Sequence, residues 1–436
     1  MLAPLRIRPF SRLLISYFLN YAGDLIGLVA LSVLVYAETG SALATSALFI
    51  ATQFLPALVS PGLTARLDRH SARMTLAAVY LAEGAIYAGL ALTAEHFSLL
   101  LILGLALADG ALSLTARGLI RAAVNATLSP HDQLRPGNAI LNVAFAASLA
   151  GGAALGGVIV AGVGVTGALI VDAASFVVVS VVLISSSHMP ATAGSSEPFL
   201  AHLREGFRRV RDDVRTRLLV AGEAAAVFFF ALIVPIEVVY AKETLETNSL
   251  GFGVLLSSWG FGCVLGSMAF IRLRSGPLLR LILLSTAAIG FAYLGMAGVQ
   301  DLIAACAFSV LGGFGNGIQW VAVMTIVQES TPADLQARVT GLLESATSIT
   351  TGIGFLLGGI VVSLASPPVA YAVSGIGVLV LVIAGTLGGT RLIRRTGAGA
   401  ASTPSAAPSA YPHPPVREAA ASIAGDAGQR DDSPAS

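Results

Sequence analysis

The sequence has 436 residues, of which 55% are hydrophobic and only 11% are charged. A soluble domain usually carries about a quarter charged residues, so this composition excludes an ordinary water-soluble protein and indicates a membrane protein. The formal net charge of +1 gives no reason to expect a nucleic-acid partner. The two cysteines, Cys263 and Cys306, lie in separate apolar runs without a metal-binding spacing, and we expect both to be packing residues.

Apolar runs follow one another along almost the whole chain. Each is close to or above the roughly 20 residues that an α-helix needs to cross the hydrocarbon core of a bilayer. Twelve such runs can be marked, at residues 13–36, 42–62, 74–94, 97–119, 139–162, 166–187, 218–241, 250–271, 277–299, 302–327, 339–364 and 369–389. The sequence therefore predicts an all-α membrane protein with twelve transmembrane helices.

The basic residues predict the orientation of these helices. Positive charge is concentrated in the cytoplasmic segments of membrane proteins. If both termini are cytoplasmic, every arginine falls in a cytoplasmic segment or at a helix end facing one, and Lys242 alone falls outside. The opposite orientation would place nearly all of the positive charge on the wrong side. We therefore expect the N-terminus and the C-terminus to be cytoplasmic.

Two segments are too polar to cross the membrane. Residues 188–216 begin with a stretch of Ala, Gly and Ser and continue with apolar residues at three- and four-residue spacing, with arginines on the other faces. This pattern predicts a cytoplasmic linker with an amphipathic helix on the membrane surface, and a lipid-binding regulator is the alternative. Residues 396–436 are rich in Ala, Pro, Ser and Gly, which predicts a disordered cytoplasmic tail.

The two halves of the chain share a pattern. Several positions recur at one constant offset without a gap, among them Gly152, Gly156 and Gly157, which recur as Gly354, Gly358 and Gly359. A duplicated six-helix unit with both copies in the same orientation is the parallel repeat found in some transporters. We therefore expect two six-helix bundles, residues 1–187 and 217–395, joined by the linker.

A charge-dense turn, Gly62 to Arg73, separates the second and third apolar runs. It reads GLTARLDRHSAR, and this much charge cannot lie in hydrocarbon. Asp68, Arg69 and Arg73 match the loop between helices 2 and 3 of the major facilitator superfamily, Gly-x-x-x-Asp-Arg-x-Gly-Arg-Arg, although both glycines are replaced. Together with the repeat, this resemblance implies the major facilitator fold over residues 1–395.

The resemblance also implies a conformational latch. In the superfamily the Asp of this loop meets cationic and helix-terminal partners and locks the outward-open state. Carried over, Asp68, Arg69, Arg73 and Arg117 would form the latch, with Asp68 facing the start of the eleventh helix near Val339. For Arg117, at the expected cytoplasmic end of the fourth helix, ordinary membrane anchoring is the alternative. The latch would control rocking of one half against the other.

Carboxylates inside the apolar runs are candidates for proton coupling. Each costs about 2.5 to 3.5 kcal/mol to insert, and loss of water favours the neutral form, so such a group can carry a proton. Asp24, Glu83 and Asp109 fall near the middle of their runs, whereas four others lie closer to a membrane surface: Asp172, Glu223, Glu237 and Glu344.

The resemblance ranks the three central carboxylates. Helices 1 and 4 of the superfamily line the central cavity and helix 3 is peripheral, so Asp24 is the first candidate, Asp109 the second and Glu83 the third. Asn20 lies one turn before Asp24 on the same helix face and could be its partner or a substrate contact. The alternative for each carboxylate is a structural hydrogen bond to a neighbouring helix.

Aromatic and amide side chains predict the character of the cavity. Trp259 lies in the middle of the eighth run and Phe229 in the middle of the seventh, and the tenth run carries Asn316, Gln319 and Trp320. A weakly polar aromatic cavity with acids and no central Arg or Lys favours lipophilic compounds that are neutral or cationic. The alternative for each aromatic residue taken singly is packing.

The glycines of the fifth run permit two interpretations. Gly152 to Gly157 resembles the end of the antiporter signature Gly-Pro-x-x-Gly-Gly, with Ala153 in place of the proline. The alternative is close packing of helices through small residues. The spacing recurs at Gly358 and Gly359 in the eleventh run, where the signature is not expected, so the support for antiport is modest.

Motifs for enzymatic chemistry are absent from the sequence. Lys242 is the only lysine and follows Ala241, so a phosphate-binding loop with Gly-Lys-Ser/Thr cannot exist. The six histidines lie in loops or in the tail and form no zinc-binding pair. We therefore expect neither an enzyme nor a cofactor.

The whole pattern favours a transporter. Gly23-Asp24, the charged loop and residues 171–176 resemble the branch of drug:proton antiporters that contains macrolide and enterobactin exporters. We predict a monomer that spans the bacterial inner membrane and uses the proton gradient to export lipophilic small molecules of drug, macrolide or siderophore type. The alternatives are a proton-coupled importer of a small metabolite and a non-transporting membrane receptor or scaffold on the same fold.

Overall fold

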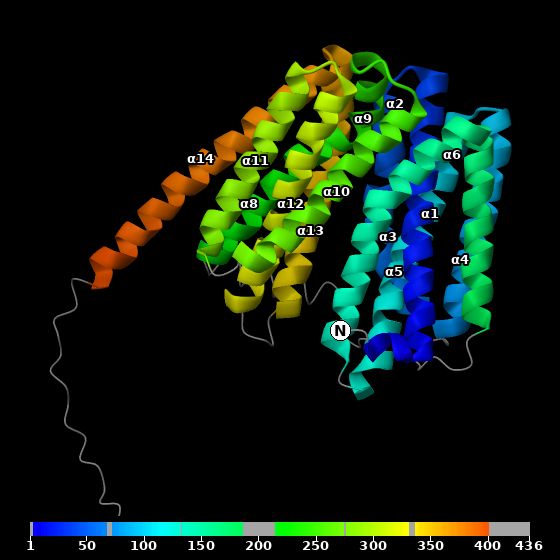
Figure 1. Ribbon diagram of the computed structural model, residues 1–436, viewed down its shortest axis with the longest axis horizontal. Helices are drawn as coiled ribbons and strands as arrows, with labels where there is room; N and C mark the ends of the chain where they lie inside the picture. Colours follow the sequence, from blue (N-terminus) through cyan, green and yellow to red (C-terminus); the bar gives the residue numbers. More distant parts are fainter. Residues whose placement is uncertain are drawn as a thin grey trace, which may run out of the picture. The chain divides into compact units, whose positions relative to one another are not determined.

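The computed structural model describes residues 3–67, 72–131, 133–185, 214–273, 276–330 and 336–400. Within these ranges every regular element is a helix (Figure 1). Eleven described stretches are long and apolar enough to cross a membrane. One of them, Pro136–Ile184, has 49 residues and is broken at Gly164 (φ 79°, ψ 176°), so it accounts for two crossings. The predicted all-α membrane fold is confirmed.

The chain divides into two compact units, Met1–Thr386 and Leu387–Ser436. The first unit contains the helices that build the cavity described below. The second unit begins within the last helix, α14 (Pro367–Ala400). This helix extends past Thr396, where the disordered tail was predicted to begin. The remainder of that tail, residues 401–436, and most of the predicted linker helix lie outside the described residues.

The first half of the larger unit starts with a long helix, α1 (Arg8–Thr39). It ends at Gly40, whose left-handed φ of 56° lets its N–H bond to the Tyr36 carbonyl oxygen. The second crossing is interrupted by a π-helical turn, and the other helices are long. The elements after α1 are α2 (Ala42–Phe49), η2 (Ile50–Phe54), α3 (Leu55–Leu67), α4 (Ala72–Glu95), α5 (Leu99–Leu128) and α6 (Leu134–Ile184), with the short turns η1 (Ala3–Arg6) and η3 (Ser129–His131).

The second half begins with an interrupted crossing. Pro235 lacks an N–H and crowds the preceding turn, so the α-helix gives way to a 3₁₀ turn and then to a π-helical turn. The elements of this crossing are α8 (Val214–Ile233), η4 (Val234–Ile236), α9 (Glu237–Val239) and η5 (Tyr240–Thr244). Four long helices precede α14, namely α10 (Ser249–Leu273), α11 (Leu278–Gly298), α12 (Leu302–Ser330) and α13 (Gln336–Leu364).

The glycines of α6 pack this helix against one neighbour in its own half and one in the other half. A Cβ atom on Gly156 would lie 3.1 Å from the Cα atom of Ile26 in α1, and Gly152 is equally close to α1. On the adjoining face, a Cβ atom on Gly157 would lie 2.9 Å from the Cα atom of Gly253 in α10. The two backbones therefore touch without intervening side chains.

The repeated glycines of α13 have equivalent neighbours. Gly358 faces the Leu232 backbone of α8, in its own half, and leaves no room for a Cβ atom. Gly359 faces the other half, where a Cβ atom would lie 2.5 Å from the Ser46 Oγ atom of α2. The sequence repeat thus corresponds to a repeated contact, in which α6 packs on α1 and α10 and α13 packs on α8 and α2. Packing between small residues accounts for both glycine clusters.

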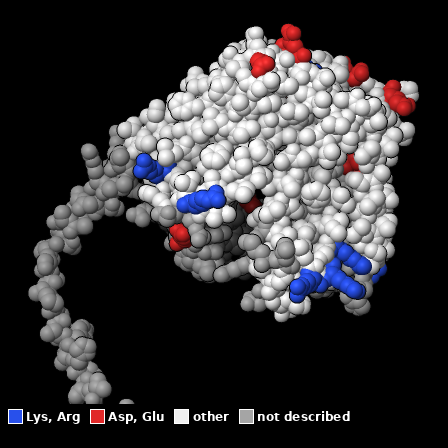
Figure 2. Space-filling view, in the orientation of Figure 1, with Lys and Arg blue, Asp and Glu red and all other residues white. Residues whose placement is uncertain are grey.

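The contacts between the halves run from the middle of the crossings, where Gly260 faces the Leu149 backbone, to the ends where α1 joins α2 and η5 joins α10. These ends are here called the short-loop side. Gly157 and Gly359 lie toward this side, and the Tyr36 hydroxyl there donates a hydrogen bond to Glu243. Figure 2 shows that most acidic side chains on the visible face gather along the short-loop edge. The basic side chains gather at the opposite edge, here called the arginine-rich side.

Candidate functional site

A cavity of about 690 Å³ lies between the two halves of the larger unit. A hollow is visible in Figure 2 on the arginine-rich side. The described titratable side chains that line the cavity are Tyr21, Asp24, Tyr87, Asp109, Arg117, Glu223, Glu237 and Tyr293. Seven of the predicted site residues line it, namely Asp24, Asp109, Arg117, Trp259, Asn316, Gln319 and Trp320.

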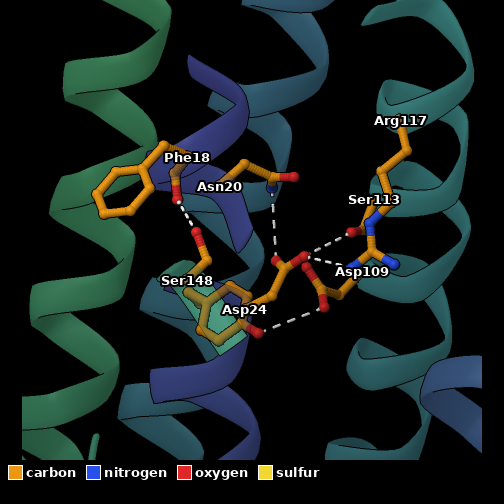
Figure 3. Close-up of polar contacts among 8 residues, drawn as sticks. Phe18, Asn20, Asp24, Asp109, Ser113, Arg117 and Ser148 are labelled. Atoms are coloured by element: carbon orange, nitrogen blue, oxygen red, sulfur yellow. Dashed lines mark hydrogen bonds and ion pairs between the residues drawn. The ribbon is translucent and has the colours of Figure 1, made fainter. Parts of the chain in front are cut away.

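Asp24 is the centre of a polar cluster at the wall of the first half (Figure 3). Its Oδ2 atom accepts hydrogen bonds from Arg117 Nη2 at 2.7 Å and from Ser113 Oγ at 2.9 Å. Its Oδ1 atom accepts a longer bond, 3.5 Å, from Asn20 Nδ2. Residues four apart lie on one face of a helix, so Asn20 and Asp24 on α1 meet Ser113 and Arg117 on α5. Asn20 is buried behind Asp24 and does not line the cavity.

The position of Arg117 differs from the prediction. The fourth apolar run was expected to end beside this residue, whereas α5 continues to Leu128 and keeps Arg117 within the membrane-spanning helix. Its guanidinium carbon lies 4.3 Å from the centre of the Tyr21 ring, and its partner is Asp24. The expectation of a cavity without a central arginine is therefore wrong. Because Asp24 neutralises this arginine, the pair adds no net charge to the cavity.

The predicted latch falls mostly outside the described structure. Asp68 and Arg69 lie in the gap between α3 and α4, so their contacts with Arg117 or with the start of α13 stay predictions. Arg73 is half-buried in the first turn of α4, and its Nε atom is buried without a hydrogen-bond partner among the described residues.

The other carboxylates of the first half are buried. Asp109 lines the cavity, and its Oδ2 atom accepts a hydrogen bond from the Tyr87 hydroxyl at 3.4 Å. Glu83 is fully buried, does not line the cavity, and has no described partner for either carboxyl oxygen. Asp172 is also fully buried, because Gly23 of α1 leaves room for its side chain. A pair of glycines four residues apart, Gly23 and Gly27, is the sequence signal for this pocket.

Two carboxylates of the second half also line the cavity, which their predicted depth did not indicate. Glu223 on α8 accepts a hydrogen bond from Gln319 Nε2 at 3.3 Å. Glu237 follows the break at Pro235 and has no hydrogen-bond partner among the described residues. The break therefore brings an unpaired carboxylate to the cavity wall. Glu344 remains exposed and lies outside the lining.

Aromatic rings line the part of the cavity wall that the second half of the protein contributes. The Phe230 and Trp259 ring centres are 5.6 Å apart, and Trp259 stacks on Tyr293 at 5.8 Å and 11°. Phe229 was predicted to face the cavity, but Phe230 lines it instead. Successive helical residues point about 100° apart, so only one of two adjacent phenylalanines can face the cavity. Phe229 instead packs against Gly377 of α14.

Comparison with known proteins identifies the family. A family model described as transmembrane secretion effector matches residues 1–425. The chain belongs to the transmembrane secretion effector family. This family is part of the major facilitator superfamily, so the protein is a membrane transporter and not an enzyme. None of the curated proteins compared with the chain matches it significantly.

Solved structures share the fold of this transmembrane secretion effector protein. The nucleoside transporter NupG has a TM-score of 0.67 at 14% identity, covering 87% of this chain and 98% of its own. A bacterial homologue of the iron transporter ferroportin, in an inward-facing state, has a TM-score of 0.66 at 17% identity, covering 87% and 98%. The POT family transporter PepTSo has a TM-score of 0.66 at 12% identity, covering 87% and 97%. These likenesses confirm the major facilitator fold.

Proposed function

We propose that this protein is a proton-driven exporter of lipophilic small molecules that are neutral or cationic. In this proposal it spans the bacterial inner membrane with both termini in the cytoplasm. The arginine-rich side is then cytoplasmic, as the concentration of positive charge on that side suggests. The contacts on the short-loop side, together with the hollow on the arginine-rich side, correspond to an inward-facing state in a cycle of alternating access.

The charge balance of the cavity carries the proposal for the substrate. Among the described lining residues, the only basic side chain is Arg117, which Asp24 neutralises. Asp109, Glu223 and Glu237 have no basic partner in the described part of the chain. These carboxylates would repel an anion and attract a cation. The aromatic faces offer contacts to cations and to neutral lipophilic molecules. The cavity therefore favours cationic and neutral compounds over anionic ones.

The cluster around Asp24 supports coupling to protons. A carboxylate out of water needs a cation or a proton to offset the loss of hydration. Asp24 has Arg117 as its cation in this state, and a proton could replace it when Arg117 turns to other partners. The exchange would tie proton binding at Asp24 to the rearrangement of α1 against α5. Asp109, with one buried oxygen unpartnered among the described residues, is the second candidate.

Energised inside-out membrane vesicles test the function. We expect vesicles with this protein to accumulate ethidium, a lipophilic cation, and to lose the accumulation when a protonophore is added. Asp24→Asn should abolish the protonophore-sensitive part. Accumulation that survives in this variant would move coupling away from Asp24. No accumulation of ethidium or of a panel of lipophilic drugs, combined with uptake of metabolites by whole cells, would favour the importer.

Glu237→Gln should separate cationic from neutral substrates. The variant keeps the size of the side chain but removes a negative charge next to aromatic rings. We expect ethidium accumulation to fall by about tenfold, equivalent to about 1.4 kcal/mol, with little change for a neutral lipophilic drug. Glu344→Gln, which removes an exposed carboxylate outside the cavity, is the matched control. An equal loss for both substrates would argue against recognition of charge by Glu237.

A further inference from the structure

One carboxyl oxygen of Asp172 is buried and lacks a hydrogen-bond partner in the described structure. The residue lies on α6, is fully buried and does not line the cavity. Its Oδ1 atom accepts a hydrogen bond from Ser175 Oγ at 3.2 Å. Its Oδ2 atom is buried and has no hydrogen-bond partner among the described residues. Burying a polar atom without a hydrogen bond costs free energy, so native structures usually give such an atom a hydrogen-bond partner.

The unpartnered oxygen points to the same place as a tyrosine hydroxyl. A Cβ atom on Gly27 of α1 would lie 2.7 Å from Asp172 Oδ2 and 2.5 Å from the Tyr87 hydroxyl oxygen. Both oxygens therefore converge on the space that the missing side chain of Gly27 leaves open. On its other side, the Tyr87 hydroxyl donates to Asp109 Oδ2 at 3.4 Å. Because a phenolic oxygen can donate and accept at once, it can also accept a hydrogen bond from Asp172.

The surrounding charges favour a neutral Asp172. The carboxylates on the elements packed around it are Asp24 on α1, Glu83 on α4 and Asp109 on α5, and the hydroxyls are those of Tyr80 and Tyr87 on α4. The fully buried side chains of the described structure include no lysine or arginine. Arg117, which lines the cavity, is paired with Asp24. An ionised Asp172 would have no counterion, whereas a proton on Oδ2 would give this atom a hydrogen bond to donate.

We infer that Asp172 is a second proton-binding site, connected to the cavity through Tyr87 and Asp109. This inference deepens the proposed proton-driven export and rests on it for its role in transport. Protonated Asp172 gives its Oδ2 proton to the Tyr87 oxygen, while Tyr87 passes its own hydroxyl proton to Asp109. One proton thus moves from Asp172 to Asp109 without net change at Tyr87. The reverse sequence refills Asp172 from the cavity.

Infrared spectroscopy of the purified full-length protein tests the site without a transport assay. A protonated carboxyl group has a carbonyl band distinct from that of a carboxylate, and the band shifts when deuterium replaces the proton. At neutral pH we expect Asp172→Asn to lack one protonated-carboxyl band that the unmodified protein shows. An unchanged set of bands would mean that Asp172 is ionised, and would overturn the proposal. Loss of the band on addition of sodium ions would also overturn it, in favour of a cation site.

The connection through Tyr87 is tested by the rate of exchange. In Tyr87→Phe we expect the Asp172 band to persist and its exchange in D₂O to slow by at least an order of magnitude. The matched control is Tyr80→Phe, because Tyr80 and Tyr87 are both buried and both pack against Phe176. Its exchange should equal that of the unmodified protein. Equal exchange in both variants would exclude the relay, even if Asp172→Asn does not fold. Failure of proton-driven export in vesicles would leave these spectroscopic results standing.

Discussion

Arg117→Gln is expected to abolish protonophore-sensitive transport and to lower the unfolding temperature of the purified protein. The change leaves Asp24 with only Ser113 and Asn20 as described partners. Removal of one member of a buried ion pair costs about 3 to 5 kcal/mol. We expect a smaller loss here, because the Arg117 and Asp24 side chains are still 28% and 14% exposed. Thermal unfolding in detergent and ethidium accumulation in vesicles measure the two effects.

A double variant separates stability from coupling. Asp24→Asn combined with Arg117→Gln removes both charges, so its unfolding temperature should recover toward that of the unmodified protein while transport stays absent. Arg121→Gln is the control, because Arg121 is exposed on the same helix and has no ion pair in the described structure. A double variant as unstable as the single one would show that the pair is not what stabilises this region.

Gly157→Leu is expected to slow transport strongly by hindering closure of the short-loop side. A Cβ atom at this position would lie 2.8 Å from the Ser249 carbonyl oxygen and 2.9 Å from the Gly253 Cα atom, so α6 and α10 must separate. Each transport cycle has to restore this contact, and we expect the rate to fall by an order of magnitude or more. Spin labels at Glu38 and Leu250, in a variant with both native cysteines replaced by serine, should report a longer distance by pulsed EPR.

The control for this prediction lies on the same helix. Gly151→Leu adds the same side chain where no atom lies within 4 Å of a Cβ position. Its spin-label distances and transport should match those of the protein with glycine at both sites. If Gly157→Leu kept the shorter distance, the contact between the halves would not depend on the glycine, and the assignment of this seam as the closing surface would fail.

The fold follows from the sequence because the membrane restricts what a chain can do. Backbone groups in hydrocarbon must bond within a helix, so long apolar runs are sufficient to predict crossings. The ends of the helices were harder to predict. Charges at Arg117 and Arg121 resemble a helix end, yet α5 continues to Leu128 because Asp24 and Tyr21 offer Arg117 partners inside the protein. The break at Gly164 falls in the predicted gap between the fifth and sixth apolar runs, residues 139–162 and 166–187.

The site was predicted only in part, because the depth of a residue in the membrane does not determine the direction in which its side chain points. Asp24 and its neighbour Asn20 were found from their position along α1 and their spacing. Counting residues placed Asp172 and Glu237 closer to a membrane surface than Asp24, whereas the directions of their side chains depend on features of other residues. Gly27 opens the space beside Asp172, and Pro235 interrupts the helix before Glu237. Such tertiary effects cannot be read from the depth of a single residue.

The contact of Gly157 with Gly253 also bears on how easily the seam can reopen. Where two backbones meet directly, no side chains interlock, so none has to leave its rotamer when the surfaces part. The attraction is mainly dispersion, which is weak for each atom pair and falls off steeply with distance. Such a seam separates without a large barrier and re-forms in the same register, which keeps the closed and open arrangements close in free energy. A transporter that changes state in every cycle needs a seam that opens readily and closes again in the same register.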